Sequence, residues 1–217
     1  MHNTSTRVSS RTIVLGASES GKSYWSKRQV DNLGDELVLV WDPQHEWAGQ
    51  DATDGIKGAH TFPGMAELCR WIQQNNPRER GARLVVQSAR TADFAAFCKL
   101  AYTAQNCWAV VDEAHAWMRA NELPEEARYL VQVSRHRRVS LLLVAQRPTG
   151  LAPDVRDNKA RVVLFHMPGQ ASLAWVRGEF GKEAEESVRK LPPRCYLDLD
   201  AITTGPAGPK PTRDATG

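Results

Sequence analysis

The chain has 217 residues, of which 41% are hydrophobic and 24% are charged, and its formal net charge is +3. This composition predicts one soluble globular domain with a substantial core. The longest apolar runs, residues 37–41 and 141–145, are far shorter than the roughly 18 residues of a membrane span. No positively charged start precedes an apolar stretch, so we expect neither a membrane span nor an export signal. We therefore do not expect a secreted protein.

The four cysteines lie far apart in the sequence, at positions 69, 98, 107 and 195. They form no C-x-x-C pair and no Cys/His spacing typical of a zinc site. We interpret them as reduced core thiols of a cytoplasmic protein.

Strands and helices are predicted to alternate along the chain, between a polar N-terminal arm over residues 1–11 and a disordered Pro/Gly-rich tail over residues 203–217. The predicted strands are 13–15, 36–41, 61–62, 83–87, 107–111, 139–145, 162–166 and 195–199. The predicted helices are 24–32, 63–74, 92–104, 124–135 and a helical pair over 170–191. Residues 147–158 are expected to form a loop. This alternation predicts one α/β domain over residues 12–202, with a mostly parallel central sheet and helices on both faces.

The first predicted strand runs directly into a phosphate-binding motif. Gly16, Gly21, Lys22 and Ser23 satisfy G-x-x-x-x-G-K-[ST], the Walker A pattern or P-loop. Its glycines let consecutive N–H groups and the N-terminus of the next helix face phosphates. Lys22 should reach the β- and γ-phosphates, and the Ser23 hydroxyl should bind Mg²⁺. An ordinary Gly/Ser turn before a helix is the alternative. The residues predicted to bind the nucleotide are Gly16, Ala17, Ser18, Glu19, Ser20, Gly21, Lys22, Ser23 and Tyr24.

A second motif ends the apolar strand at residues 107–111. Asp112 and Glu113 follow this strand, which is the Walker B pattern. Asp112 is predicted to hold Mg²⁺, and Glu113 to orient or deprotonate an attacking water. The alternative is that both carboxylates only cap the following helix. With Ala114 and His115 they also spell the box of a helicase superfamily, but those enzymes need two tandem domains and this chain has room for one.

Positive charge is concentrated in the second half of the chain. Residues 127–153 contain no acidic residue but include five arginines, and three more cations follow soon after. Such a concentration suggests a polyanion nearby, either nucleotide phosphates or a nucleic acid backbone. A solvated basic face, with cations favoured at a helix C-terminus, is the alternative. The cations are Arg128, Arg135, Arg137, Arg138, Arg147, Arg156, Lys159 and Arg161.

The segment 133–148 carries a family resemblance. A basic helix end, an apolar strand and the terminal Gln146-Arg147-Pro148 follow the Walker B pattern, and this order resembles the FtsK/HerA superfamily of DNA-pumping ATPases. Asp42-Pro43-Gln-His-Glu46 is similar to the Asp-Pro-x-x-Glu element of the HerA branch. The resemblance covers about residues 8–200 and implies a RecA-like P-loop domain. For a chain this short, it is greatest to the genome-packaging ATPases of tailless icosahedral viruses with internal membranes.

The resemblance implies roles that the residue pattern alone does not give. Gln146 would be the polar sensor of the γ-phosphate or the attacking water. One arginine would be a finger that reaches a neighbouring subunit's nucleotide, with Arg135 favoured, then Arg138, and Arg137 also open. The cations from Arg147 to Arg161 would lie near DNA phosphates.

The same resemblance implies ATP and Mg²⁺ as cofactors and a homo-oligomeric ring, expected to be a hexamer, that moves double-stranded DNA into a capsid. Partners would be capsid vertex or membrane proteins of a virion, and the location the host cytoplasm or the packaging vertex. The alternatives are another FtsK/HerA-type pump (conjugation, repair or Zot-like phage assembly), a small P-loop phosphotransferase, and a nucleotide-gated scaffold.

Overall fold

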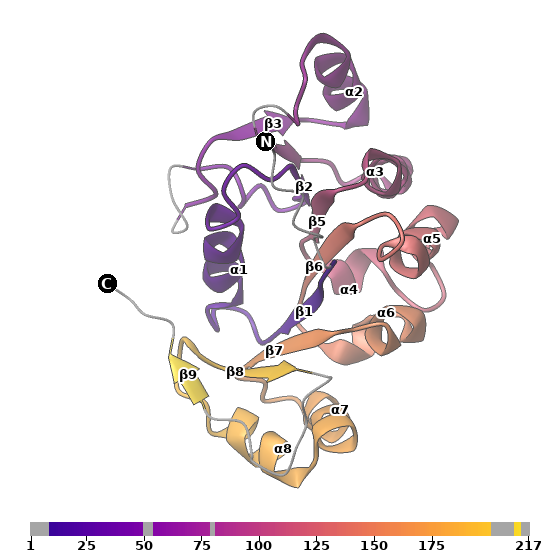
Figure 1. Cartoon of the computed structure of the whole chain (residues 1–217). Coiled ribbons are helices and arrows are strands. Elements are labelled where there is room, and N and C mark those ends of the chain that lie inside the picture. The colour runs from indigo at the N-terminus through magenta and orange to yellow at the C-terminus, as the bar shows by residue number, and fades with distance from the viewer. Residues whose placement is uncertain (1–8, 50–53, 79–80, 201–210, 214–217) are drawn as a thin grey trace.

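A computed structural model describes residues 9–49, 54–78, 81–200 and 211–213. The described strands form one sheet in the order β3-β4-β2-β5-β6-β1-β7-β8-β9 (Figure 1). Strands β3, β4, β2, β5, β6, β1 and β7 run parallel to one another. At one edge of the sheet, β8 pairs antiparallel with β7, and β9 pairs antiparallel with β8. The predicted mostly parallel sheet is therefore confirmed. The strands are β1 Arg11–Leu15, β2 Val38–Trp41, β3 Ala59–Phe62, β4 Arg83–Val86, β5 Cys107–Val111, β6 Val139–Ala145, β7 Arg161–Phe165, β8 Cys195–Asp200 and β9 Pro211–Arg213.

The apolar runs of the central strands follow from burial on both faces. Every residue of β2 and β6 is buried. Alternate side chains enter two separate cores, as in β6, where Leu141 and Leu143 pack in one core and Leu142 and Val144 in the other. A sheet covered on one face only would need polar residues at alternate positions of β6.

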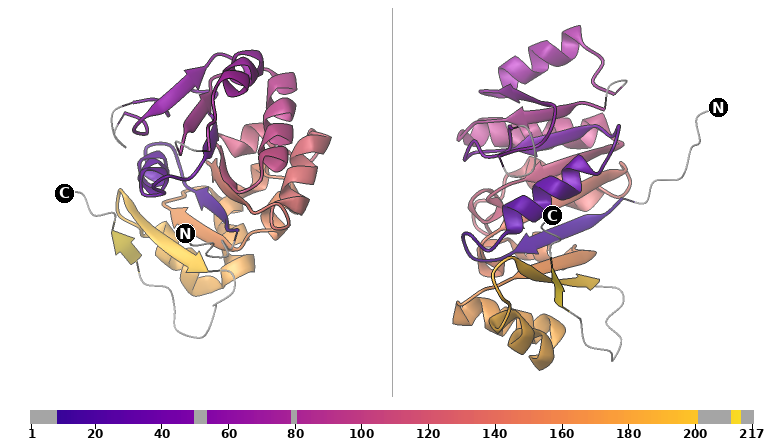
Figure 2. Two further views of the ribbon diagram at one scale, coloured as in Figure 1. Left: turned by 45° about the horizontal axis from the view of Figure 1, so that its top comes forward. Right: turned by 90° about the vertical axis from the view of Figure 1, so that its left-hand side faces the viewer.

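Helices cover both faces unequally. On one face, α1 (Lys22–Asp31) packs on β1 and β6, and Trp47 and Ile56 from the segment after β2 share its core. Figure 2 views the molecule from the side of α1, which lies over the central strands. The opposite core takes side chains from α2 (Met65–Gln74), α3 (Thr91–Ala104), α4 (Ala114–Trp117), α5 (Glu125–Val133), α6 (Pro153–Asp157), α7 (Gln170–Phe180) and α8 (Lys182–Arg189).

Four expectations need correction. Residues 147–158 are not a plain loop, because a 3₁₀ turn, η1 (Pro148–Gly150), and α6 form there, each with proline in its first turn. The tail over 203–217 is not disordered throughout, since residues 211–213 pair with β8 as β9; its other residues lie outside the described part. Arg11, placed in the N-terminal arm, belongs to β1, and residues 1–8 of that arm are outside the description. Cys69 is exposed rather than a core thiol, while the other three cysteines are buried.

Candidate active site

The predicted P-loop connects β1 to α1 and is tied to both strands beside β1. The N–H of Gly16 donates to the carbonyl of Ala145 at the end of β6 (3.3 Å), and the N–H of Ala17 donates to the carbonyl of His166 after β7 (3.0 Å). Because parallel strands end on the same side of a sheet, these bonds place the loop at the carboxyl ends of the strands, where α/β proteins bind ligands. This side is called the carboxyl edge below.

Two glycines are required by the close packing of the loop. A Cβ on Gly16 would lie 2.5 Å from Cβ of Phe165, too close for any side chain. Gly21 has a φ of +102°, in the left-handed region that favours glycine, and a Cβ there would lie 3.3 Å from Cα of Arg194. The loop is thus fixed by β7 and by the segment before β8.

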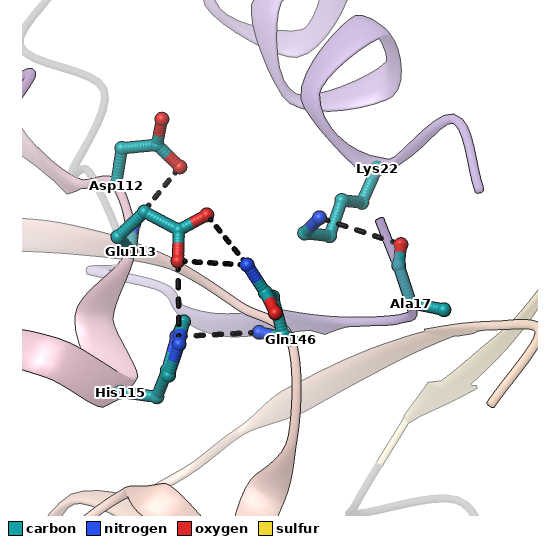
Figure 3. Close-up of polar contacts among 6 residues, drawn as sticks. All are labelled: Ala17, Lys22, Asp112, Glu113, His115 and Gln146. Atoms are coloured by element: carbon teal, nitrogen blue, oxygen red, sulfur yellow. Dashed lines mark hydrogen bonds and ion pairs between the residues drawn. The ribbon is translucent and has the colours of Figure 1, made fainter. Parts of the chain in front are cut away.

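Lys22 and Ser23 begin α1, where the helix N-terminus favours anions. Lys22 is only 6% exposed, and its Nζ donates to the carbonyl of Ala17 (3.4 Å) across the loop (Figure 3). Its charge is therefore held over the loop where phosphates are predicted to bind. The Ser23 hydroxyl lies in the same first turn.

Glu113 faces Gln146 across the neighbouring strand ends. The amide nitrogen Nε2 of Gln146 donates to both carboxylate oxygens of Glu113, at 3.3 and 3.2 Å (Figure 3). Glu113 has a left-handed backbone (φ 49°), which turns the chain from β5 into α4. The structure thus brings together the predicted catalytic carboxylate and the predicted sensor amide.

His115 completes this cluster, although no catalytic role is predicted for it from the sequence. Its Nδ1 accepts the backbone N–H of Gln146 (3.4 Å), so its proton is on Nε2, which lies 3.3 Å from Glu113 Oε2. Burial lowers the pKa of His115; the Glu113 carboxylate opposes this, and Arg147 and other cations lower it further. The lowered pKa favours the neutral imidazole, whose Nε2 lies against the same Glu113 carboxylate that Gln146 contacts.

Asp112 is the more buried carboxylate of the Walker B pair, with 2% of its surface exposed. Its Oδ2 accepts the indole N–H of Trp47 (3.0 Å), and its Oδ1 accepts the N–H of Glu113 (2.9 Å). Burial raises the pKa of Asp112 to about 6, although these two hydrogen bonds lower it. A nearby cation would favour the charged form.

The oxygen donors at this edge fit Mg²⁺. Among the described residues no group of three or more His, Cys, Asp or Glu side chains could hold a metal ion by itself. Mg²⁺ sites of nucleotide enzymes need only one or two protein oxygens, because substrate phosphates and water supply the others. The Ser23 hydroxyl, at the start of α1, and the buried Asp112 carboxylate, directly after β5, are oxygen donors of this kind.

The predicted arginine fingers lie at the amino ends of the parallel strands, opposite the carboxyl edge. Residues 135–138 form an exposed turn before β6, whereas Gln146 directly follows β6. Eight residue steps at about 3.3 Å each separate Arg138 from Gln146 by about 26 Å. The structure therefore does not bring Arg135, Arg137 or Arg138 to the P-loop of their own chain. We call residues 135–138 the basic turn.

Two cations late in the basic stretch, Lys159 and Arg161, have acidic partners within the chain. Lys159 Nζ lies 2.7 Å from Glu179 and its side chain is 9% exposed. Arg161 pairs with Asp198 through two guanidinium nitrogens. Both lie at the edge opposite to Arg147, so the expected DNA-contacting series from Arg147 to Arg161 is not one surface.

Comparisons with solved structures agree with this geometry. The genome-packaging NTPase B204 of Sulfolobus turreted icosahedral virus 2, in complex with AMPPCP, superposes with a TM-score of 0.70 at 18% identity, over 94% of this chain and 97% of that one. B204 of Sulfolobus turreted icosahedral virus gives 0.71 at 18%, over 96% and 98%. VirB4 of Thermoanaerobacter pseudethanolicus gives 0.64 at 13%, over 97% and 91%.

The chain has the P-loop NTPase fold of B204 and VirB4. The resemblance noted in the sequence is thus confirmed at the level of the fold. No family profile matches the chain, and no curated protein matches it in sequence. In the part of the chain that the structure describes, no helix is long and apolar enough to span a bilayer.

Two residues of the site, Trp47 and His115, are not predicted to belong to it from the sequence motifs. His115 stands two residues after Glu113, a spacing that could have suggested a contact at the same strand end. Trp47 lies 65 residues before Asp112, and only the pairing of β2 with β5 brings the two together. No local signal in the sequence points to that contact.

Proposed function

We propose that the chain hydrolyses ATP and couples the hydrolysis to the movement of double-stranded DNA, with genome packaging as its task. The observation that carries the proposal is the contact of Gln146 with Glu113 beside a complete P-loop. A carboxylate held by an amide at this place suits the activation of a water molecule. A phosphotransferase would instead need a substrate lid that excludes water.

Each side chain of the site has a proposed role. Glu113 accepts a proton from the attacking water, while Gln146 positions that water or senses the γ-phosphate. Lys22 neutralises the β- and γ-phosphates, and the N–H groups of residues 16–23 bind their oxygens. Ser23 and Asp112 would hold Mg²⁺, which draws charge from the phosphate oxygens when it is bound. The contact of Tyr24 with the nucleotide remains a prediction.

We propose a ring as the active assembly, with six subunits. An arginine finger is needed to stabilise charge that develops in the transition state. The basic turn is about 26 Å from the carboxyl edge of its own chain. Arg135, or else Arg138 or Arg137, would therefore act on the nucleotide of the next subunit. Repeating this head-to-tail contact generates a closed ring when the rotation between neighbours is one sixth of a turn.

Three observations support DNA as the polymer that is moved. The fold is that of packaging NTPases and of VirB4, the arginines of the basic turn are exposed, and Arg147 is exposed next to the active site. Lys159 and Arg161 are poor candidates for DNA contacts because they are ion-paired within the chain. Capsid vertex or membrane proteins of a virion are the proposed partners, at the packaging vertex or in the host cytoplasm.

The test is ATP hydrolysis measured with double-stranded DNA, with single-stranded DNA and without DNA, alongside the mass of the particle. We expect stimulation by double-stranded DNA in particles of several 24.2 kDa subunits. Hydrolysis by a monomer without DNA stimulation would contradict the motor and leave an ATPase. Nucleotide binding without hydrolysis would favour the scaffold, and phosphate transfer to a small acceptor would favour the phosphotransferase.

A further inference from the structure

Trp47 contacts the carboxylate that is predicted to bind Mg²⁺, Asp112. It is 0% exposed and packs in the core beneath α1, yet its indole N–H donates to Asp112 Oδ2 at 3.0 Å. Asp112 Oδ1 accepts the N–H of Glu113. Each carboxylate oxygen therefore has one fixed donor, and this pair of bonds defines the plane of the carboxylate.

Trp47 is itself held on both sides. Its backbone N–H donates to Asp42 Oδ2 (3.0 Å), and its carbonyl accepts the N–H of Ile56 (2.8 Å). Asp42, at 0% exposure, also accepts the N–H of Glu46 (2.9 Å) and the side-chain amide of Gln87 (3.1 Å). The backbone of Trp47 is therefore anchored to the ends of β2 and β4 without any contribution from the phosphate site.

We propose that Trp47 is a positioning residue for the Mg²⁺-binding carboxylate. Its indole N–H holds Asp112 in one rotamer, so that the remaining lone pairs face the phosphate site. This inference rests on the proposed role of Asp112 in MgATP binding. Partners that orient metal-binding side chains in this way typically change metal affinity by about 10- to 100-fold when they are removed.

Core packing alone does not account for this contact. Trp41 is also 0% exposed and lies six residues before Trp47, but its indole nitrogen has no hydrogen-bond partner among the described residues. It packs against Phe94, Phe97 and Trp117 instead. This fold thus accommodates a buried tryptophan without using its N–H, and Trp41 is a matched control for Trp47.

The experiment compares Trp47→Phe with Trp41→Phe. Both changes shorten a buried tryptophan, but only the first removes a hydrogen bond to the site. The affinity for a fluorescent ATP analogue is measured in EDTA and across a Mg²⁺ titration, and thermal unfolding is followed for both variants. We expect Trp47→Phe to bind the analogue normally in EDTA but to need about tenfold more Mg²⁺ to reach the tight complex. Trp41→Phe should match the wild type in both conditions.

Equal Mg²⁺ dependence of Trp47→Phe and wild type would overturn the proposal, as would an equal loss in both variants. If Trp47→Phe does not fold, replacing Trp47 by benzothienylalanine keeps the ring shape, removes the N–H and decides the same question. The wild type also separates the two proposals. Mg²⁺-strengthened nucleotide binding without hydrolysis would contradict the proposed function and leave the role of Trp47 testable, whereas nucleotide binding that Mg²⁺ does not strengthen would overturn the role of Trp47 directly.

Discussion

Replacing Arg135 by alanine should abolish hydrolysis while leaving ATP affinity unchanged. A guanidinium that reaches the γ-phosphate stabilises charge present only in the transition state, and its loss typically lowers the rate by about 10³- to 10⁵-fold. The turn that carries Arg135 is separated from its own active site by the whole of β6, or about 26 Å, which no arginine side chain spans. Any effect of Arg135 on hydrolysis must therefore cross a subunit boundary.

Mixing two inactive variants tests whether Arg135 acts on the nucleotide of another subunit. Lys22→Ala subunits keep the arginine and lose the P-loop lysine, and Arg135→Ala subunits do the reverse. In a ring assembled at random from equal amounts, about one quarter of the interfaces pair an intact P-loop with an intact arginine. We expect about that fraction of wild-type, DNA-stimulated hydrolysis from the mixture, and almost none from either variant alone.

The control is Arg128→Ala, since Arg128 lies on α5 and is half-exposed beside Asp154, 3.7 Å away. It should retain wild-type activity. No recovery in the mixture, once subunit exchange is verified, would exclude Arg135 as the finger and move the test to Arg138 and Arg137. Failure of all three would refute the reasoning that places the finger on the basic turn.

Three further outcomes are expected. Lys22→Ala should lose tight ATP binding because it removes the cation facing the phosphates, whereas Glu113→Gln should bind ATP normally and lose turnover. Isothermal titration measures the binding and phosphate release measures the turnover. Wild-type turnover in Glu113→Gln would show that another group is the base. Gly16→Ala should prevent nucleotide binding, because its Cβ would lie 2.5 Å from Phe165; normal affinity would show that the loop is not held as described. Under native conditions a thiol reagent should modify Cys69 rapidly and the other described cysteines only on unfolding, since Cys69 alone of the four is exposed; fast labelling of more than one thiol per chain would contradict the burial.

The sequence predicted features that local chemistry decides. The P-loop requires glycine at two positions and a lysine at the start of a helix, and these residues are contiguous from Gly16 to Ser23. The central strands were found because burial on both faces makes them continuously apolar, as in β6. The contact between Glu113 and Gln146 could also be anticipated, since both residues follow strands whose ends share one edge.

Long-range contacts were not predictable in the same way. Strand order decides that β2 lies between β4 and β5, and nothing in the β2 sequence specifies those neighbours. The hydrogen bond between Trp47 and Asp112 depends on that order, so it could not be predicted. The antiparallel direction of β8 was missed for the same reason, because pairing with β7 depends on the path of α7 and α8.

The cations of the basic stretch are close together in the sequence but are separated in the fold by β6. In the sequence, residues 127–161 form a single cationic segment. In the fold, β6 carries the chain across the full width of the sheet, so the basic turn is at one edge and Arg147 at the other. β6 is paired along its length with β1 on one side and β5 on the other, which keeps it extended and its two ends apart. One chain therefore contains a P-loop and an arginine turn that its own fold keeps apart, and only contact between subunits can join them in the mixing experiment.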